Sequence, residues 1–216
     1  MHALLFSGGT LRWMKRMQPQ PHDWVVGIDA GNAFLLEHGL RPTIAVGDFD
    51  TLPSQTLLQL QQMGVVVQRH PAEKDATDTE LALDLALAQG YKEIWLFGGW
   101  GSRWDHSLAN LYLLEKARRR GARLVLWSPK NCAFLAEVGF QQIPKTPAPY
   151  LSLVPLDQEV RGITLEGVRY PLTDAVLIRG EGRGISNEIL AEKATLRVGS
   201  GTLLLCLSSD TPAFEG

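Results

Sequence analysis

The segment TIAVGDFDTLP, residues 43–53, joins an apolar run to two carboxylates that are separated by a single residue. The run TIAVG, residues 43–47, is short and apolar, which is typical of a buried strand. Asp48 and Asp50 follow it directly. In open parallel sheets, ligands bind beyond the carboxyl ends of the strands. The segment therefore predicts a strand of a parallel sheet that ends at a polar, ligand-binding edge.

Five further apolar runs in the first 130 residues have the same texture, and they alternate with segments of helical period. These runs are ALLF (3–6), WVVGI (24–28), VVVQ (65–68), EIWLFG (93–98) and RLVLW (123–127). Several of the intervening segments end in Gly, which is typical of a helix C-cap. The clearest helix lies at 105–121, where Leu108, Leu111 and Tyr112 share one face. The alternation predicts an α/β domain over residues 1–135, with a parallel sheet in a three-layer arrangement.

The texture changes after Pro129, because strand-like runs follow one another without a helical interval. The runs are YLSLVPL (150–156), GITLEGV (162–168), DAVLIRG (174–180), ATLRVG (194–199) and GTLLLCLS (201–208). Five such runs separated by Gly, Pro and Asp predict an all-β sandwich domain over residues 140–216. The stretch 139–150 contains three prolines and is taken as the boundary region.

Composition excludes several classes of protein. The formal net charge of -2 provides no basic field to attract nucleic acid, so we expect a small-molecule partner. Cys132 and Cys206 lie among apolar residues, which indicates free, buried thiols in a reducing compartment. Neither a basic leader nor an apolar run of about 18 residues is present, so we expect no signal peptide and no membrane span. These features predict a soluble, cytoplasmic protein.

Charged side chains recur where the predicted strands end. They are Asp29 after the second strand, Asp48 and Asp50 after the third, Lys74, Asp75 and Asp78 after the fourth, and Arg103, Asp105 and His106 after the fifth. Carboxylates gathered at one edge repel each other, and a divalent cation lowers that cost. Magnesium is usually held by one or two carboxylates together with substrate phosphates. With Lys74 and Arg103 available for phosphate oxygens, the edge predicts a site for a metal-bound nucleotide.

Simpler interpretations of these residues remain open at this point. TDTE, residues 77–80, fits a capping box with Thr77 as N-cap, and Asp78 in a first helical turn can serve only to oppose the helix dipole. Asp48 and Asp50 can lie on a solvated loop. The segment GGWGSRWDH, residues 98–106, is either a surface turn or a functional Gly-rich loop, and its two tryptophans favour the second interpretation.

Six motifs, taken together and in order, resemble those of bacterial thiamine pyrophosphokinases. They are DAGNAFLLEHGLRPTIAVGDFDT (29–51), KDATDTELAL (74–83), GSRWDHSLAN (101–110), YLSLVPL (150–156), GVRYPL (167–172) and GISNEI (184–189). The resemblance covers nearly the whole chain. It implies transfer of the terminal diphosphate of ATP to the hydroxyl of thiamine, giving thiamine diphosphate and AMP, with Mg²⁺ required. It also implies an α/β domain, a β-sandwich and a homodimer with active sites between subunits.

The same resemblance assigns roles residue by residue. Asp29, Asp48, Asp50 and Asp78 match the acidic metal and phosphate site, and Asp48, Asp50 and Asp78 are the expected catalytic residues. The nucleotide side comprises Asp29, Lys74, Asp75, Arg103, Asp105 and His106. Thiamine is expected at Tyr170, Ser186 and Asn187, where an aromatic face and small polar groups suit a flat cationic ligand. Asp50 or Asp78 can act as the base, and the sequence does not choose between them.

One motif departs from the family pattern, which usually reads Asp-Gly-Gly-Ala-Asn where this chain has DAGNA, residues 29–33. Ala30 replaces a glycine, and an amide moves from position 33 to Asn32. Three alternative functions are also kept. They are a related magnesium-dependent pyrophosphokinase with another acceptor such as a pterin, a glycosyltransferase that uses DFD to hold a sugar nucleotide, and a sensor that binds thiamine or nucleotide without turnover.

Overall fold

The structure is a computed structural model that describes residues 1–50, 52–71, 73 and 75–215. Lys74, one of the expected site residues, lies outside the described residues. The chain divides into two compact units, Met1–Ser128 and Pro129–Gly216. Each unit is described by itself below.

The first unit is built on a parallel sheet of six strands in the order β6-β5-β1-β2-β3-β4. The strands are β1 (Ala3–Phe6), β2 (Trp24–Ile28), β3 (Ile44–Gly47), β4 (Val66–Arg69), β5 (Glu93–Phe97) and β6 (Arg123–Trp127). Every strand expected from the apolar runs is present, and its ends differ from the expected ones by no more than one residue. β1 is buried along its whole length, as parallel strands covered on both faces are.

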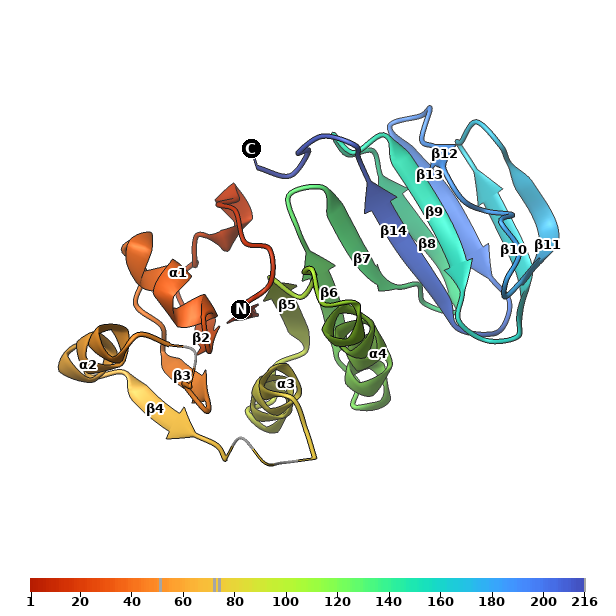
Figure 1. Ribbon diagram of the computed structural model, residues 1–216. Helices are drawn as coiled ribbons and strands as arrows, with labels where there is room; N and C mark the ends of the chain where they lie inside the picture. Colours follow the sequence, from red (N-terminus) through yellow and green to blue (C-terminus); the bar gives the residue numbers. More distant parts are fainter. Residues whose placement is uncertain (51, 72, 74, 216) are drawn as a thin grey trace. The chain divides into compact units, whose positions relative to one another are not determined.

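Helices cover both faces of this sheet. They are α1 (Gly31–Glu37), α2 (Ser54–Gln62), α3 (Asp78–Ala88) and α4 (Trp104–Arg119), with a short 3₁₀ turn, η1 (Lys15–Met17). The chain moves outward through β2, β3 and β4 and then returns to β5 and β6 on the other side of β1. Right-handed crossovers therefore place α1 and α2 on one face and α3 and α4 on the other. The expected three-layer α/β domain is confirmed (Figure 1).

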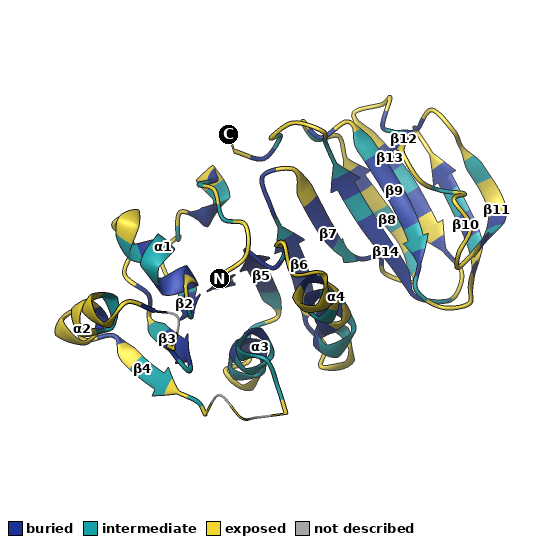
Figure 2. Ribbon diagram, in the orientation of Figure 1, coloured by how far each residue is buried: buried dark blue, intermediate teal, exposed yellow. Residues whose placement is uncertain are grey.

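Packing on the two faces agrees with this arrangement. Leu36 of α1 and Leu57 and Leu60 of α2 share one hydrophobic cluster with Ala45 of β3. On the other face, α3 packs over β1, β2 and β3 and against α4. Figure 2 shows buried residues along the central strands, whereas α2 and the edge strand β4 are largely exposed.

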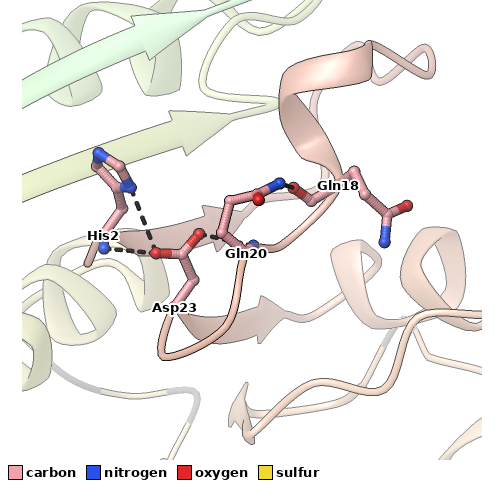
Figure 3. A network of polar contacts seen from close by, with 4 residues as sticks. All are labelled: His2, Gln18, Gln20 and Asp23. Carbon is pink, nitrogen blue, oxygen red and sulfur yellow. Dashed lines mark hydrogen bonds and ion pairs between the residues drawn. The ribbon is translucent and has the colours of Figure 1, made fainter.

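The amino-terminal ends of the strands are tied together by Asp23, which precedes β2. Asp23 Oδ1 accepts a hydrogen bond from the His2 backbone N–H at 2.7 Å and lies 3.3 Å from His2 Nδ1, and Oδ2 accepts from Gln20 N at 2.9 Å (Figure 3). Burial raises the pKa of Asp23, but these hydrogen bonds outweigh it and hold the pKa below the ordinary value. This Asp-His pair lies where the parallel strands begin, at the edge opposite to the one that binds ligands in such sheets, so it serves the fold.

In the described part of the second unit, residues 129–215, the named secondary-structure elements are all β-strands, and they pair antiparallel. Its strands form the orders β12-β9-β14-β7 and β11-β10-β13-β8. They are β7 (Asn131–Leu135), β8 (Gly139–Pro144), β9 (Tyr150–Pro155), β10 (Glu159–Glu166), β11 (Leu172–Ile178), β12 (Asn187–Glu188), β13 (Lys193–Val198) and β14 (Leu203–Ser208). The expected sandwich-like β domain is confirmed. The proline-rich stretch taken as the boundary contains β8, an edge strand, where Pro144 is tolerated at the strand end.

Both cysteines belong to the second unit and both are free, as expected. Cys132 is buried on β7, as expected, whereas Cys206, on the adjacent strand β14, is only partly buried rather than fully buried. Burial raises the pKa of the Cys206 thiol to about 12, so it is protonated at neutral pH. Among the described residues, no helix is long and apolar enough to cross a membrane.

Candidate active site

A cavity of about 480 Å³ opens beyond the carboxyl ends of the first unit's strands. Its lining comes from the segments that follow β1, β2, β3 and β5 and from the starts of α3 and α4. The lining residues are Ser7, Gly8, Gly9, Ile28, Asp29, Ala30, Asp48, Ala76, Thr77, Asp78, Thr79, Gly98, Gly99, Trp100, Gly101, Ser102, Arg103, His106, Ser107 and Asn110. The strand order reverses between β1 and β5, and open α/β sheets bind ligands at such a point.

Asp29 enters this cavity from the end of β2 in an unusual backbone conformation. Its φ is 44°, in the left-handed region that costs a residue with a side chain roughly 1–2 kcal/mol. A backbone hydrogen bond to Val46 O holds it beside β3. A Cβ on Gly47 would lie 1.8 Å from Asp29 Oδ1, so this carboxylate fits only because residue 47 is glycine. Ala30 stands where the family pattern usually has a glycine. Its φ of -60° is accessible to any residue, so the backbone at this position does not require glycine.

The two aspartates that follow β3 occupy different positions. Asp48 lines the cavity, whereas Asp50 is exposed and lies outside the lining. Between them, Phe49 is buried in the cluster under α2 and has a φ of 61°. Asp50 N donates a hydrogen bond to Asp48 Oδ1 at 3.0 Å. The buried phenyl ring therefore anchors a tight turn, in which Asp50 supports Asp48 through its backbone.

The start of α3 places Asp78 in the cavity wall. Thr77 is the N-cap, as expected, and its hydroxyl accepts a hydrogen bond from Glu80 N at 3.1 Å. The Thr79 hydroxyl lies 3.1 Å from that of Ser7, which joins the helix to the end of β1. Asp75 precedes the helix and is exposed, outside the lining.

A glycine-rich loop after β5, residues 98–102, forms the facing wall. Gly9 N donates to Gly98 O at 3.0 Å, and a Cβ on Gly9 would lie 2.2 Å from the same oxygen. Helix α4 holds the loop from behind, because Asn110 Nδ2 donates to Gly99 O at 2.8 Å. The Ser107 hydroxyl accepts from Gly101 N at 3.2 Å. The loop is therefore fixed on both sides, which excludes the interpretation of this segment as an unsupported surface turn.

The charged residues at the start of α4 separate into two groups. Arg103 and His106 line the cavity, whereas Asp105 does not. Arg103 Nη2 lies 2.6 Å from Asp105 Oδ2, and both side chains are largely exposed. Their hydrogen bond raises the pKa of Arg103 and lowers that of Asp105. Asp105 thus orients a guanidinium at the cavity mouth, where it can contact an anion.

The donor set of the cavity fits a magnesium ion that arrives with phosphates. Asp29, Asp48 and Asp78 present carboxylate oxygens, the ligands that magnesium prefers. Within residues 1–50, 52–71, 73 and 75–215, no group of three or more metal-binding side chains is close enough to enclose an ion alone. Magnesium usually takes one or two carboxylates and completes its shell with water and phosphate. The arrangement matches that shared mode of binding.

The second unit has a smaller cavity of about 270 Å³, lined by Tyr170, Leu172, Arg183, Gly184, Ile185 and Asn187. Asn187 is buried, and its side chain holds the backbone of Tyr170 through two hydrogen bonds. Tyr170 N donates to Asn187 Oδ1 at 3.0 Å, and Asn187 Nδ2 donates to Tyr170 O at 2.7 Å. Tyr170 is 62% exposed. Ser186 lies beside the cavity with a φ of 56° and is held by its N–H to Ser152 Oγ at 3.0 Å.

Several lining residues were absent from the expected set. Ser7, Gly8 and Gly9 follow β1, and the signal for them was the run SGG directly after the apolar run ALLF. Asn110 is a buried polar residue on the inner face of α4, seven residues after Arg103. Two helical turns bring such a residue back to the same face, so its spacing was the available signal.

Comparison with known proteins agrees with this division of the chain. Residues 18–126 match the family described as thiamin pyrophosphokinase, catalytic domain, and residues 141–203 match thiamin pyrophosphokinase, vitamin B1 binding domain. Thiamine pyrophosphokinase of Bacillus subtilis (strain 168) is 33% identical over 190 residues, which cover 88% of this chain and 89% of that protein. This chain belongs to the thiamin pyrophosphokinase family.

Solved structures of thiamin pyrophosphokinases have the same fold. The Bacillus subtilis protein superposes with a TM-score of 0.90 at 30% identity, covering 97% of this chain and 100% of that one. The Geobacillus thermodenitrificans protein gives a TM-score of 0.87 at 35% identity, covering 99% and 100%. Apart from Ser7, Gly8 and Gly9, the residues that line the larger cavity belong to the part that matches the catalytic domain, and the smaller cavity lies within the part that matches the vitamin B1 binding domain.

Proposed function

We propose that the protein transfers the diphosphate of ATP to the hydroxyl oxygen of thiamine, giving thiamine diphosphate and AMP, with Mg²⁺ as cofactor. Membership of the family supports the enzyme class. The observation that carries the finer proposal is the gathering of three carboxylates opposite a fixed glycine-rich loop in one cavity. Carboxylates alone do not attract a polyphosphate, so the proposal requires a cation between them and the nucleotide.

The reaction joins the thiamine oxygen to the β-phosphorus and breaks the bond from that phosphorus to the oxygen that leaves with AMP. Magnesium held by Asp29 and Asp48, with phosphate oxygens and water completing its shell, would neutralise charge on the phosphate oxygens. The backbone of the glycine-rich loop and the guanidinium of Arg103 bind and orient the polyphosphate. Fixed partners of this kind accelerate transfer mainly by alignment and charge stabilisation.

The hydroxyl of thiamine loses its proton during transfer. Asp78 lines the cavity and Asp50 lies outside it, which favours Asp78 as the acceptor of this proton. Asp50 then acts through its backbone hydrogen bond to Asp48. The Asp50→Asn variant is expected to keep most of the wild-type kcat, because its backbone hydrogen bond to Asp48 remains, whereas Asp78→Asn is expected to lose most of it.

Thiamine is proposed to bind at the smaller cavity. The exposed Tyr170 ring offers a face to the cationic thiazolium, and Asn187 holds that ring in place through the backbone. Nδ2 of Asn187 has a second hydrogen for the ligand, because only one is used by Tyr170 O. Ser186 adds a hydroxyl beside the rim.

Incubation of the purified protein with magnesium, ATP and equimolar thiamine and hydroxymethyl pterin tests the acceptor. Formation of thiamine diphosphate alone supports the proposal. Pyrophosphorylated pterin would assign the chain to the related pyrophosphokinase instead. Binding of thiamine without any product would indicate a sensor. In a separate incubation with magnesium and a sugar nucleotide, hydrolysis of that nucleotide would indicate a glycosyltransferase. A homodimer, as the resemblance implies, is part of the proposal and is tested by sedimentation equilibrium.

A further inference from the structure

We propose that Asn32 is a positioning residue for Asp29, holding its backbone so that the carboxylate enters the cavity. The inference rests on the proposed function, in which Asp29 meets magnesium and phosphate. It concerns the amide that stands one position earlier than in the family pattern. Asn32 lies in the first turn of α1 and does not line the cavity itself.

Two hydrogen bonds connect Asn32 to a single oxygen. Asn32 Nδ2 donates to Asp29 O at 3.1 Å, and Asn32 N donates to the same oxygen at 3.0 Å. The side chain is completely buried. Asp29 has the left-handed φ of 44°, a conformation that persists only where the surroundings fix it. Clamping its carbonyl oxygen restrains the peptide plane that follows Asp29, and hence the direction in which its side chain leaves the backbone.

Gly27 of β2 makes room for this amide. A Cβ on residue 27 would lie 2.0 Å from Asn32 Oδ1. Among the described residues, Asn32 Oδ1 accepts no hydrogen bond. Turning the amide over would bring Oδ1 against Asp29 O without a donor between them, so the orientation is fixed by Asp29. A buried amide oxygen without a donor is unfavourable for stability, so packing alone does not account for an asparagine here.

The neighbouring position explains why the amide lies at residue 32 in this chain. Ala33 packs against the hydrophobic cluster that contains Ala45, Phe49, Leu52 and Leu60. An amide at residue 33 would meet apolar side chains, whereas an amide at residue 32 meets the Asp29 backbone. The Asn32 side chain therefore holds the Asp29 backbone, and each of the two polar side chains fits because a glycine lies next to it. Gly27 makes room for Asn32, and Gly47 makes room for Asp29.

The test measures binding in the full chain, by calorimetry with magnesium and α,β-methylene-ATP, which cannot be cleaved. We expect Asn32→Ala to weaken this binding by about tenfold or more while thiamine binding stays unchanged. Asn32→Leu keeps the branched shape of the side chain but removes the donor, so it should behave like Asn32→Ala. Thr43→Val is the matched control, because Thr43 Oγ1 accepts from Val25 N at the opposite end of β2. Its nucleotide binding should equal that of the wild type.

A double-mutant cycle with Asp29→Asn separates positioning from general packing. If Asn32 acts through Asp29, Asn32→Ala has little further effect in the Asp29→Asn background. An equal loss in both backgrounds, wild-type binding by Asn32→Leu, or a matching loss of thiamine binding would overturn the inference. Nucleotide binding by the wild type without formation of thiamine diphosphate would refute the proposed function alone. Absence of magnesium-dependent nucleotide binding by the wild type would refute both.

Discussion

Replacement of Gly47 by alanine perturbs the candidate metal site without changing a charge. Gly47 ends β3 with a φ of +148°, and an added Cβ would lie 1.8 Å from Asp29 Oδ1 and 2.7 Å from Asp29 Cγ. Real Cβ contacts begin at about 3.0 Å, so the carboxylate must retreat by about 1.2 Å, the difference between these two distances. The main chain of both residues is held in the sheet, which leaves the Asp29 side chain as the part that moves.

The size of the effect follows from this displacement. A misplacement of about 1 Å at a reacting centre costs about 100-fold in rate, which is about 2.7 kcal/mol of activation free energy. We therefore expect kcat of Gly47→Ala to fall about 100-fold. Overpacking also destabilises a folded protein, typically by about 1–3 kcal/mol, so the variant should melt earlier but still fold.

The assay follows thiamine diphosphate formation at saturating ATP and thiamine, with circular dichroism to confirm folding. Gly90→Ala is the matched control, because Gly90 also has a positive φ, +86°, but has nothing within 4 Å of an added Cβ. It should lose about 1 kcal/mol of stability and keep its kcat. A folded Gly47→Ala protein with kcat within about threefold of the wild type would refute the placement of Asp29 at the reacting phosphates.

Three further predictions concern other parts of the molecule. Asp48→Asn should lower kcat about 100-fold or more with little change in Tm, because it removes a proposed metal ligand from the cavity wall and not a residue of the hydrophobic core; full activity would refute the proposed metal role. Ser186→Ala should raise the KM for thiamine more than the KM for ATP, and equal changes would count against its placement. Lys116 bridges Glu80 and Asp84 at 2.8 and 2.7 Å, so Lys116→Met should lower Tm by about 2–4 °C. Burial lowers the pKa of Lys116, but its hydrogen bonds to Asp84 and Glu80 raise the pKa by more, so the pKa lies above the ordinary value of 10.5. The stabilisation is therefore fully present below pH 10.5 and is lost as the pH rises through the raised pKa. A Tm difference between Lys116→Met and the wild type that persists at higher pH would contradict this interpretation.

The sequence was sufficient to predict the strands of the first unit, because a parallel strand covered on both faces is a continuous apolar run. It was less informative about α4. Leu108 and Tyr112 were expected to share an apolar face, and they are 50% and 61% exposed, whereas the helix packs through Leu113, Leu114 and Ala117. Periodicity identifies the helix but does not say which of two apolar stripes the sheet covers.

In the candidate site, position in the chain predicted which carboxylates follow strands but not which of them enter the cavity. Asp48 and Asp50 are equivalent by spacing, and the buried Phe49 between them separates their positions. The sequence also did not predict which glycines make room for neighbouring side chains. Gly47 fits the strand pattern, and its function as the space for the Asp29 carboxylate depends on the distance between β2 and β3.

In the proposed reaction, thiamine accepts the diphosphate of ATP. The most direct measurement is AMP release from ATP and magnesium by the purified protein, with and without thiamine, alongside thiamine diphosphate in the same samples. If this reaction occurs, AMP appears only when thiamine is present, in an amount equal to the thiamine diphosphate formed. AMP release that is independent of thiamine, or thiamine binding without AMP, would contradict it.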